Sequence, residues 1–106
     1  MERMGLVYRV KPEKKEEYIY AHDNIWPELA QEMRQAGVKR MYIYERDNLL
    51  FLFAEIENLE EYGKWQAASA VYGRWSAWMD RLLETPYDPK EPGVTFASMQ
   101  EVFAFE

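Results

Sequence analysis

The run Leu49-Leu50-Phe51-Leu52-Phe53-Ala54-Glu55-Ile56 decides the fold of this chain. In an extended strand its odd-numbered residues up to Phe53 face one side, and its even-numbered apolar residues face the other. A strand that is apolar on both faces is expected to be covered on both. The chain's own helices can cover only one face, so we expect a second copy of the chain to cover the other. The alternative is an exposed apolar patch, which is uncommon on monomers.

The segments around this strand predict the order β-α-β-β-α-β. Just upstream, 38–45 is a second apolar strand, and the short turn 46–48 makes the two a hairpin. The remaining strands are predicted over 4–10 and 96–105, and the helices over 13–22, 27–36, 60–67 and 71–83. This is the ferredoxin-like α+β plan, a four-stranded antiparallel sheet with helices on one face. Two such sheets packed face to face form a dimeric α/β barrel.

Local signals mark where several of these elements begin and end. Asn58 with Glu61 makes a capping box before the third helix, and Ser69 is a candidate cap for the fourth. Gly37 ends the second helix. The stretch 84–93 holds three of the five prolines and is predicted to be a loop. At 106 residues the whole chain, 1–106, is predicted to form a single domain around one core.

Composition excludes several classes of protein. The formal charge of −6 argues against binding to nucleic acid or to an anionic membrane surface. The chain has no cysteine, so disulfide and thiolate chemistry are absent. No apolar run approaches the roughly 18 residues of a membrane span, and 1–4 lacks the apolar region of a signal peptide. We therefore expect a cytoplasmic protein.

His22 is the single histidine and the first candidate for chemistry. Tyr18 precedes it by four residues, so both side chains lie on one face of the first helix. Histidine is the side chain whose ordinary pKa, about 6.5, suits proton transfer near neutral pH. The competing reading is a helix-end histidine that only caps or faces solvent. One histidine and scattered carboxylates predict no metal site, and no phosphate-binding or dinucleotide motif predicts a cofactor.

Aromatic side chains are the second candidate for function. The chain has four tryptophans and eight tyrosines, whose rings can stack on a sugar while their polar tips bond its hydroxyls. The stripe Val71, Trp75, Trp78 and Leu82 on the last helix also fits a packed core. We expect part of this stripe to pack and part of it to line a pocket.

The most specific motif of the chain is Glu16-Glu17-Tyr18, then His22, then Ile25-Trp26-Pro27-Glu28-Leu29. It resembles the EEY…H…IWPEL signature of the L-rhamnose mutarotase family, whose members interconvert the anomers of a sugar. Further matches are Gly37, Ile43-Tyr44, Asn48-Leu49-Leu50-Phe51, Arg74-Trp75 and Gln100-Glu101-Val102-Phe103. The resemblance implies a homodimeric α/β barrel that acts on a monosaccharide such as L-rhamnose without a cofactor.

The resemblance also implies roles for five residues. His22 takes the position of the family's proton donor, and Tyr18 that of a tyrosine in contact with the sugar. The family's tyrosine on the second strand is replaced by Met41, and of its adjacent tryptophan pair Trp75 remains while Ser76 replaces the other. Losing a buried polar partner typically costs about 1–3 kcal/mol. We therefore expect anomer exchange to be retained and the preferred sugar to differ.

Other readings stay open at this point. Glu55 and Glu101 lie in predicted strands and could accept a proton, or could form ion pairs with Arg9 or Arg40. The same fold hosts monooxygenases, haem-degrading enzymes, polyketide cyclases and plain binding modules. A haem enzyme would use His22 as an iron ligand, whereas a binding module would hold a sugar without accelerating its exchange.

Overall fold

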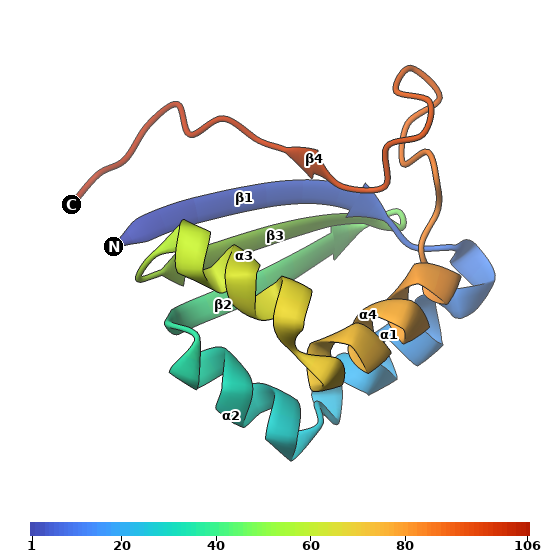
Figure 1. The fold of residues 1–106 in the computed structure, drawn as a ribbon. Helices are drawn as coiled ribbons and strands as arrows, with labels where there is room; N and C mark the ends of the chain where they lie inside the picture. Colours follow the sequence, from blue (N-terminus) through green and yellow to red (C-terminus); the bar gives the residue numbers. More distant parts are fainter.

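The computed structural model describes all 106 residues and places four helices on one face of a four-stranded antiparallel sheet (Figure 1). The strands are β1 (Glu2–Arg9), β2 (Val38–Arg46), β3 (Leu49–Ile56) and β4 (Ala97–Ser98). The four helices are α1 (Lys15–Asp23), α2 (Pro27–Gln35), α3 (Leu59–Ala68) and α4 (Ala70–Leu82), and a 3-10 turn, η1 (Pro12–Lys14), precedes α1. The strand order β2-β3-β1-β4 is that of a ferredoxin-like sheet, so the predicted α+β fold class is confirmed.

The central hairpin forms as predicted. β2 and β3 pair antiparallel from Val38–Ile56 to Arg46–Leu49. The turn between them places Asp47 and Asn48 at φ of 52° and 70°. Two-residue hairpin loops of this kind require positive φ at both positions, and Asp and Asn tolerate that conformation better than other residues with side chains. The turn therefore fixes the register that sends alternate residues of β3 to opposite faces.

The core lies between the sheet and the helices. Tyr8 and Leu50 are partners across β1 and β3, and both are buried on the face that the helices cover. α2 contributes Leu29 to this core, and α4 contributes three buried side chains, Trp75, Met79 and Leu82. Val71 and Trp78 pack against the cluster while remaining partly exposed. The apolar stripe predicted on α4 is thus mainly a packing surface.

Both predicted helix caps are present. The Asn58 side chain accepts a hydrogen bond of 3.0 Å from the Glu61 amide, and Ser69 accepts one of 3.0 Å from the Tyr72 amide. The Glu61 carboxylate does not return a bond to Asn58 and instead accepts one from Lys64. Only half of the predicted capping box is therefore formed, whereas α4 has a complete side-chain cap at its start.

The predicted final strand over 96–105 is wrong for most of its length. Only Ala97–Ser98 pairs with the sheet, opposite Val7 and Leu6 of β1. From residue 99 the chain has no regular structure, and in Figure 1 it runs past β4 towards the end of the sheet where the N-terminus also lies. An alternating apolar pattern becomes a strand only when a neighbouring strand supplies hydrogen bonds, and after the bond from the Met99 amide to the Gly5 oxygen of β1 the tail makes no further backbone hydrogen bond within the chain.

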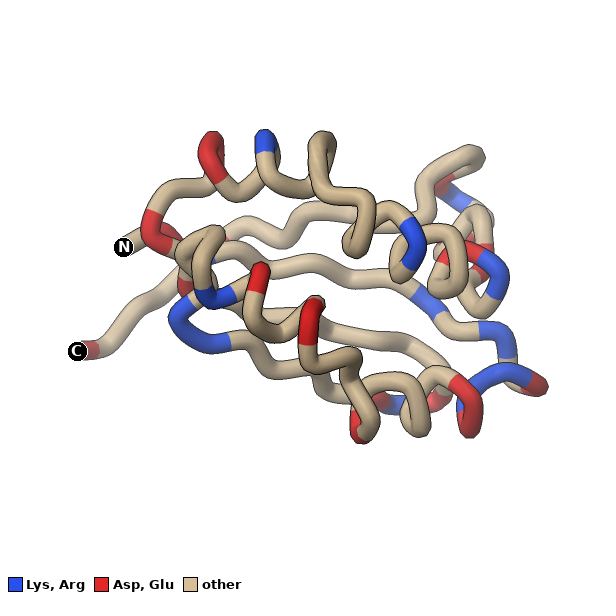
Figure 2. Tube along the Cα trace, turned by 60° about the horizontal axis from the view of Figure 1, so that its bottom comes forward, with Lys and Arg blue, Asp and Glu red and all other residues tan.

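The second face of the sheet carries no helix. Leu49, Phe51 and Phe53 of β3 are half-buried there, while Tyr42 and Tyr44 of β2 are 50% and 66% exposed. Charged residues are scattered over the helices, the hairpin and the strand ends, with uncharged residues through the middle of the sheet (Figure 2). None of the four helices has the length and apolar character needed to cross a membrane.

Candidate active site

A cavity of about 310 Å³ lies between the sheet and the helices. It is lined by 20 residues, of which 16 are hydrophobic or aromatic. β1, β2 and β3 form one side of it, and the inner faces of the four helices form the other. The remaining four residues are His22, Gln66, Ser76 and Asp80. An apolar cavity of this size with a few converging polar groups is typical of a small-molecule site.

The five residues singled out in the sequence all line this cavity. Tyr18 and His22 reach it from α1, Met41 from β2, and Trp75 and Ser76 from α4. Their positions in the chain span 18–76, so only the tertiary fold brings them together. Trp75 is also buried in the core, so it both packs and lines the cavity, as expected for part of its stripe.

His22 is held in one orientation by its own helix. Its Nδ1 lies 2.8 Å from the backbone oxygen of Tyr18, one turn earlier. A carbonyl oxygen only accepts hydrogen bonds, so Nδ1 carries the proton and donates it to that oxygen. Nε2 is then the nitrogen left to bind a ligand. The ring lies between Tyr18 and Trp75, with ring centroids 4.2 Å and 5.2 Å away.

Burial lowers the pKa of His22 below its ordinary value of 6.5. The hydrogen bond to the Tyr18 carbonyl and the nearby charge of Asp23 oppose this shift, because both favour the protonated ring. The pKa falls nevertheless, since removing the imidazolium from water is the larger effect. His22 is therefore mostly uncharged at neutral pH, and its minor protonated form is a stronger acid than an ordinary imidazolium.

The hydroxyl groups of Tyr8 and Tyr18 meet inside the cavity wall. Their oxygens are 2.7 Å apart, and both side chains are buried. Burial raises the pKa of Tyr8 to about 12 and also raises the pKa of Tyr18 well above its usual range. Both phenols therefore keep their protons. One donates to the other, which leaves one O–H free for a ligand. Tyr8 was not predicted from the sequence as a site residue, although the alternation of β1 places it on the helix-covered face.

Met41 and Tyr42 lie on opposite faces of the sheet, as the alternation of β2 predicts. Met41 faces the cavity, whereas the Tyr42 ring stacks on Phe53 on the other face with centroids 6.3 Å apart. Tyr42 therefore cannot replace the tyrosine that the family resemblance places at position 41. The cavity has a thioether there in place of a phenol.

Three further polar groups of the cavity were missed from the sequence. Gln66 of α3 donates a hydrogen bond of 3.1 Å from Nε2 to the hydroxyl oxygen of Tyr72, and Asp80 lies on the cavity rim. Tyr72, Ser76 and Asp80 are spaced by four residues on α4, so they share one face of that helix. The four-residue spacing of these polar side chains can be read from the sequence. It was overlooked because the apolar stripe beside it, Val71, Trp75, Trp78 and Leu82, predicts a packed helix face more strongly.

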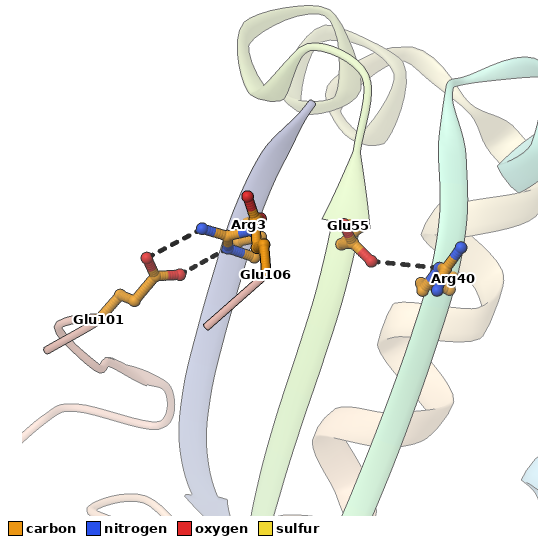
Figure 3. Close-up of polar contacts among 5 residues, drawn as sticks. All are labelled: Arg3, Arg40, Glu55, Glu101 and Glu106. Atoms are coloured by element: carbon orange, nitrogen blue, oxygen red, sulfur yellow. Dashed lines mark hydrogen bonds and ion pairs between the residues drawn. The ribbon is translucent and has the colours of Figure 1, made fainter. Parts of the chain in front are cut away.

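The two carboxylates considered as proton acceptors do not line the cavity. Glu55 forms an ion pair of 3.1 Å with Arg40, and Glu101 forms one of 2.6 Å with Arg3 (Figure 3). The sequence predicted ion pairs of these carboxylates with Arg9 or Arg40, without assigning the partners. Arg40 takes that role for Glu55, whereas Arg9 pairs with neither carboxylate and donates to the backbone oxygen of Tyr87. Arg3 lowers the pKa of Glu101 by hydrogen bonding, so that carboxylate is a weak proton acceptor.

The fold and the cavity define a ferredoxin-like α+β protein with a small-molecule site between its sheet and its helices. The family model for L-rhamnose mutarotase matches residues 3–105. The chain belongs to the L-rhamnose mutarotase family. An L-rhamnose mutarotase of Shigella flexneri is 36% identical over 107 aligned positions, which cover 97% of each chain.

Solved structures agree with this assignment. The crystal structure of an L-rhamnose mutarotase from Formosa agariphila is 25% identical, superposes with a TM-score of 0.79 and covers both chains fully. Tetracenomycin F2 cyclase from Streptomyces glaucescens superposes with a TM-score of 0.70 at 15% identity and full coverage of both chains, a likeness of fold alone. The family makes the chain an isomerase-type enzyme that acts on a sugar.

Proposed function

We propose that this chain interconverts the α and β anomers of a 6-deoxyhexose of the L-rhamnose type, with His22 as the proton donor. The observation that carries the proposal is the placement of His22, the single histidine, on the wall of an aromatic-lined cavity with Nε2 left free. The cavity volume of about 310 Å³ accommodates one monosaccharide.

Ring opening converts the pyranose to its aldehyde, and reclosure on the other face gives the other anomer. Opening needs a proton delivered to the ring oxygen and a proton withdrawn from the anomeric hydroxyl. In its protonated form His22 supplies the first from Nε2 and takes it back on reclosure. The proton of the anomeric hydroxyl passes to water and is returned from water on reclosure, so the imidazole ends each cycle unchanged. A positioned acid or base of this kind typically accelerates a reaction by about 10²–10⁴-fold.

The other cavity residues orient the sugar. Trp75 offers an aromatic surface beside His22 on which the apolar face of a sugar ring can pack. The free O–H of the Tyr8–Tyr18 pair can donate to a sugar hydroxyl. Met41 supplies an apolar contact and Ser76 a small hydroxyl where the resemblance places larger aromatic groups. The thioether of Met41 suits the methyl group of a 6-deoxy sugar, and the two replacements together change which sugar is preferred.

His22→Asn tests the proposal, because an asparagine amide can still donate to the Tyr18 carbonyl but cannot transfer a proton. Anomer exchange is measured by saturation transfer between the two anomeric protons of L-rhamnose. We expect the variant to lose about 10²-fold or more of the exchange rate. Tyr20→Phe, which changes a 64% exposed side chain on the same helix, is the control and should exchange like the natural chain.

Exchange that is undiminished in His22→Asn would remove the catalytic role of this residue. Binding of sugar by the natural chain without any acceleration would instead favour a non-catalytic binding module. A panel of L-rhamnose, L-fucose and related aldoses in the same experiment identifies the preferred substrate.

We also propose that the chain acts as a single domain within a homodimer. Support comes from the uncovered sheet face, where the half-buried side chains of β3 lie beside the exposed rings of Tyr42 and Tyr44. The tail adds three apolar side chains, Val102, Phe103 and Phe105, that are 86%, 77% and 90% exposed in one chain. A second sheet packed on this face would remove this apolar surface from water. A cytoplasmic location stays a prediction from composition.

A further inference from the structure

One face of α4 presents polar groups to the cavity at intervals of four residues. Tyr72, Ser76 and Asp80 all line it, next to the apolar Trp75 and Met79 on the same helix. Residues four apart on a helix lie one above the other, so the three polar groups form a continuous stripe. The stripe runs along one wall of a cavity whose other surfaces are almost entirely apolar.

Tyr72 is available as a hydrogen-bond donor. Its oxygen accepts a bond of 3.1 Å from Gln66 Nε2, so its own proton is not used in that bond. Burial raises the pKa of Tyr72, and the charge of Asp80 raises it further, so the phenol stays protonated. The Gln66 side-chain oxygen has no partner in the structure and is free to accept. Together the two side chains offer one donor and one acceptor to a hydroxyl group.

Asp80 is available as an acceptor. It is the only carboxylate that lines the cavity, and it forms no hydrogen bond or ion pair with another residue. By contrast, the Glu55 carboxylate on the sheet is paired with Arg40. An ionised carboxylate accepts several hydrogen bonds and donates none, so its complement is a group rich in O–H donors.

Resting on the proposed function, we infer that Tyr72 and Asp80, supported by Gln66, bind hydroxyl groups of the sugar and determine which aldose this enzyme accepts. In the proposed function, the reacting atoms of the sugar lie at His22, and the sugar ring and its methyl group contact the apolar side chains of the cavity. The hydroxyls away from the reacting centre need polar partners, and the α4 stripe holds three of the few that the cavity offers. The ligand class is a neutral, hydroxyl-bearing aldose, since a uronate carboxylate would meet the charge of Asp80.

Tyr72→Phe and Asp80→Asn test this inference, because each removes one hydrogen-bonding function and keeps the shape of the side chain. Exchange of L-rhamnose is measured by saturation transfer over a range of sugar concentrations to separate kcat from KM. We expect KM to rise about fivefold for Tyr72→Phe and about tenfold for Asp80→Asn, with kcat within about threefold of the natural chain. Asp80→Glu, which restores a carboxylate, should recover part of the affinity.

Asp47→Asn is the matched control, since it makes the same chemical change in the hairpin turn, where positive φ suits asparagine equally well. Circular dichroism of each variant verifies that it is folded. KM values within twofold of the natural chain for both variants would overturn the inference. So would a 100-fold fall in kcat at unchanged KM, which is the behaviour of a proton-transfer group. A natural chain that exchanges no aldose would instead overturn the proposed function, and this inference with it.

Discussion

At the scale of single residues, His22 combines two opposing requirements. Its proposed role as an acid requires the protonated ring, whereas its burial beside Tyr18 and Trp75 favours the neutral ring. The hydrogen bond from Nδ1 to the Tyr18 carbonyl is compatible with both forms and leaves Nε2 for the proposed proton transfer. The protonated form is a stronger acid than an ordinary imidazolium, which suits the proposed transfer to a ring oxygen.

This placement predicts the pH dependence of exchange. Since the pKa of His22 lies below 6.5, the donor form disappears as pH rises through that lowered pKa. We expect kcat to be highest on the acid side of neutrality and to fall about tenfold per pH unit above the pKa. The stability of the fold changes with pH in the opposite direction to kcat. The pKa of His22 is higher in the unfolded chain than in the folded one, so the unfolded chain binds the proton more readily. The contribution of this histidine therefore lowers the free energy of unfolding as the pH falls through 6.5 and below.

The measurement is kcat by saturation transfer between pH 4.5 and 8, with His22 titrated by NMR in the same buffers. A kcat that rises with pH through the His22 titration would contradict the donor role and identify the neutral Nε2 as a proton acceptor. Tyr20→Phe serves again as the control, since it should leave both curves unchanged.

Residue-level prediction from sequence succeeded where neighbours in space are also near in the chain. Tyr18 and His22 are four residues apart on one helix, so their contact follows from helical geometry alone. Two other contacts depend on how separate elements pack. The hydrogen bond between Tyr8 and Tyr18 joins β1 to α1, and the one between Gln66 and Tyr72 joins α3 to α4. No local pattern encodes those distances. The polar lining of the cavity was therefore only partly predictable.

At the scale of elements, the start of α4 matters most for the site, because this helix carries four of the polar or aromatic residues of the cavity. Ser69 holds that start by accepting a bond from the Tyr72 amide, and its hydroxyl donates to Glu32 of α2. One side chain thus caps α4 and connects it to a second helix. The hydrogen bond from Ser69 lowers the pKa of Glu32, which keeps the acceptor ionised.

Ser69→Ala should therefore destabilise the protein by about 1 kcal/mol, the usual effect of removing a helix N-cap. Urea denaturation followed by circular dichroism measures the change in the free energy of unfolding. Ser69→Thr keeps the hydroxyl and should retain most of the stability. Equal midpoints for Ser69→Ala and the natural chain would show that the cap does not contribute.

The hairpin and the final strand show what a sequence does and does not specify about elements. In the hairpin, pattern and turn chemistry agree, and the loop 47–48 connects two strands that are adjacent in the chain. The pattern over 96–105 is equally strand-like, but its neighbour β1 is far away in sequence, and pairing stops after Ser98. Strand propensity predicts that a segment can pair and does not predict whether a partner is within reach.

At the scale of the whole molecule, the uncovered sheet face is the dominant feature. Its middle holds Phe51 and Phe53 beside Tyr42 and Tyr44, while one end carries the charged residues Arg3, Glu55 and Arg40 (Figure 3). An apolar centre with a charged rim is the usual composition of a protein–protein interface. The two-faced pattern of β3 first indicated this surface, and the structure shows that no helix of the same chain covers it.

Tyr44→Glu tests whether two copies meet on this face. Tyr44 is 66% exposed in one chain, so the substitution should leave the fold of that chain intact, whereas it would place a carboxylate inside a dimer interface. We expect sedimentation equilibrium to give a dimer for the natural chain and a monomer for the variant. Tyr20→Glu, the same change at a 64% exposed helical position, should remain dimeric. A monomeric natural chain at micromolar concentration would rule out the interface.

The cluster of indole rings around His22 gives this protein a built-in optical probe. Trp26, Trp75 and Trp78 lie with their centroids 5.3–6.0 Å from one another, and Trp75 touches the imidazole edge-on. The surroundings of these tryptophans change when the imidazole gains a proton. They also change when a sugar displaces solvent from the cavity. Tryptophan fluorescence of the unlabelled protein should therefore follow the ionisation of His22 in a pH titration and the filling of the cavity in a titration with sugar.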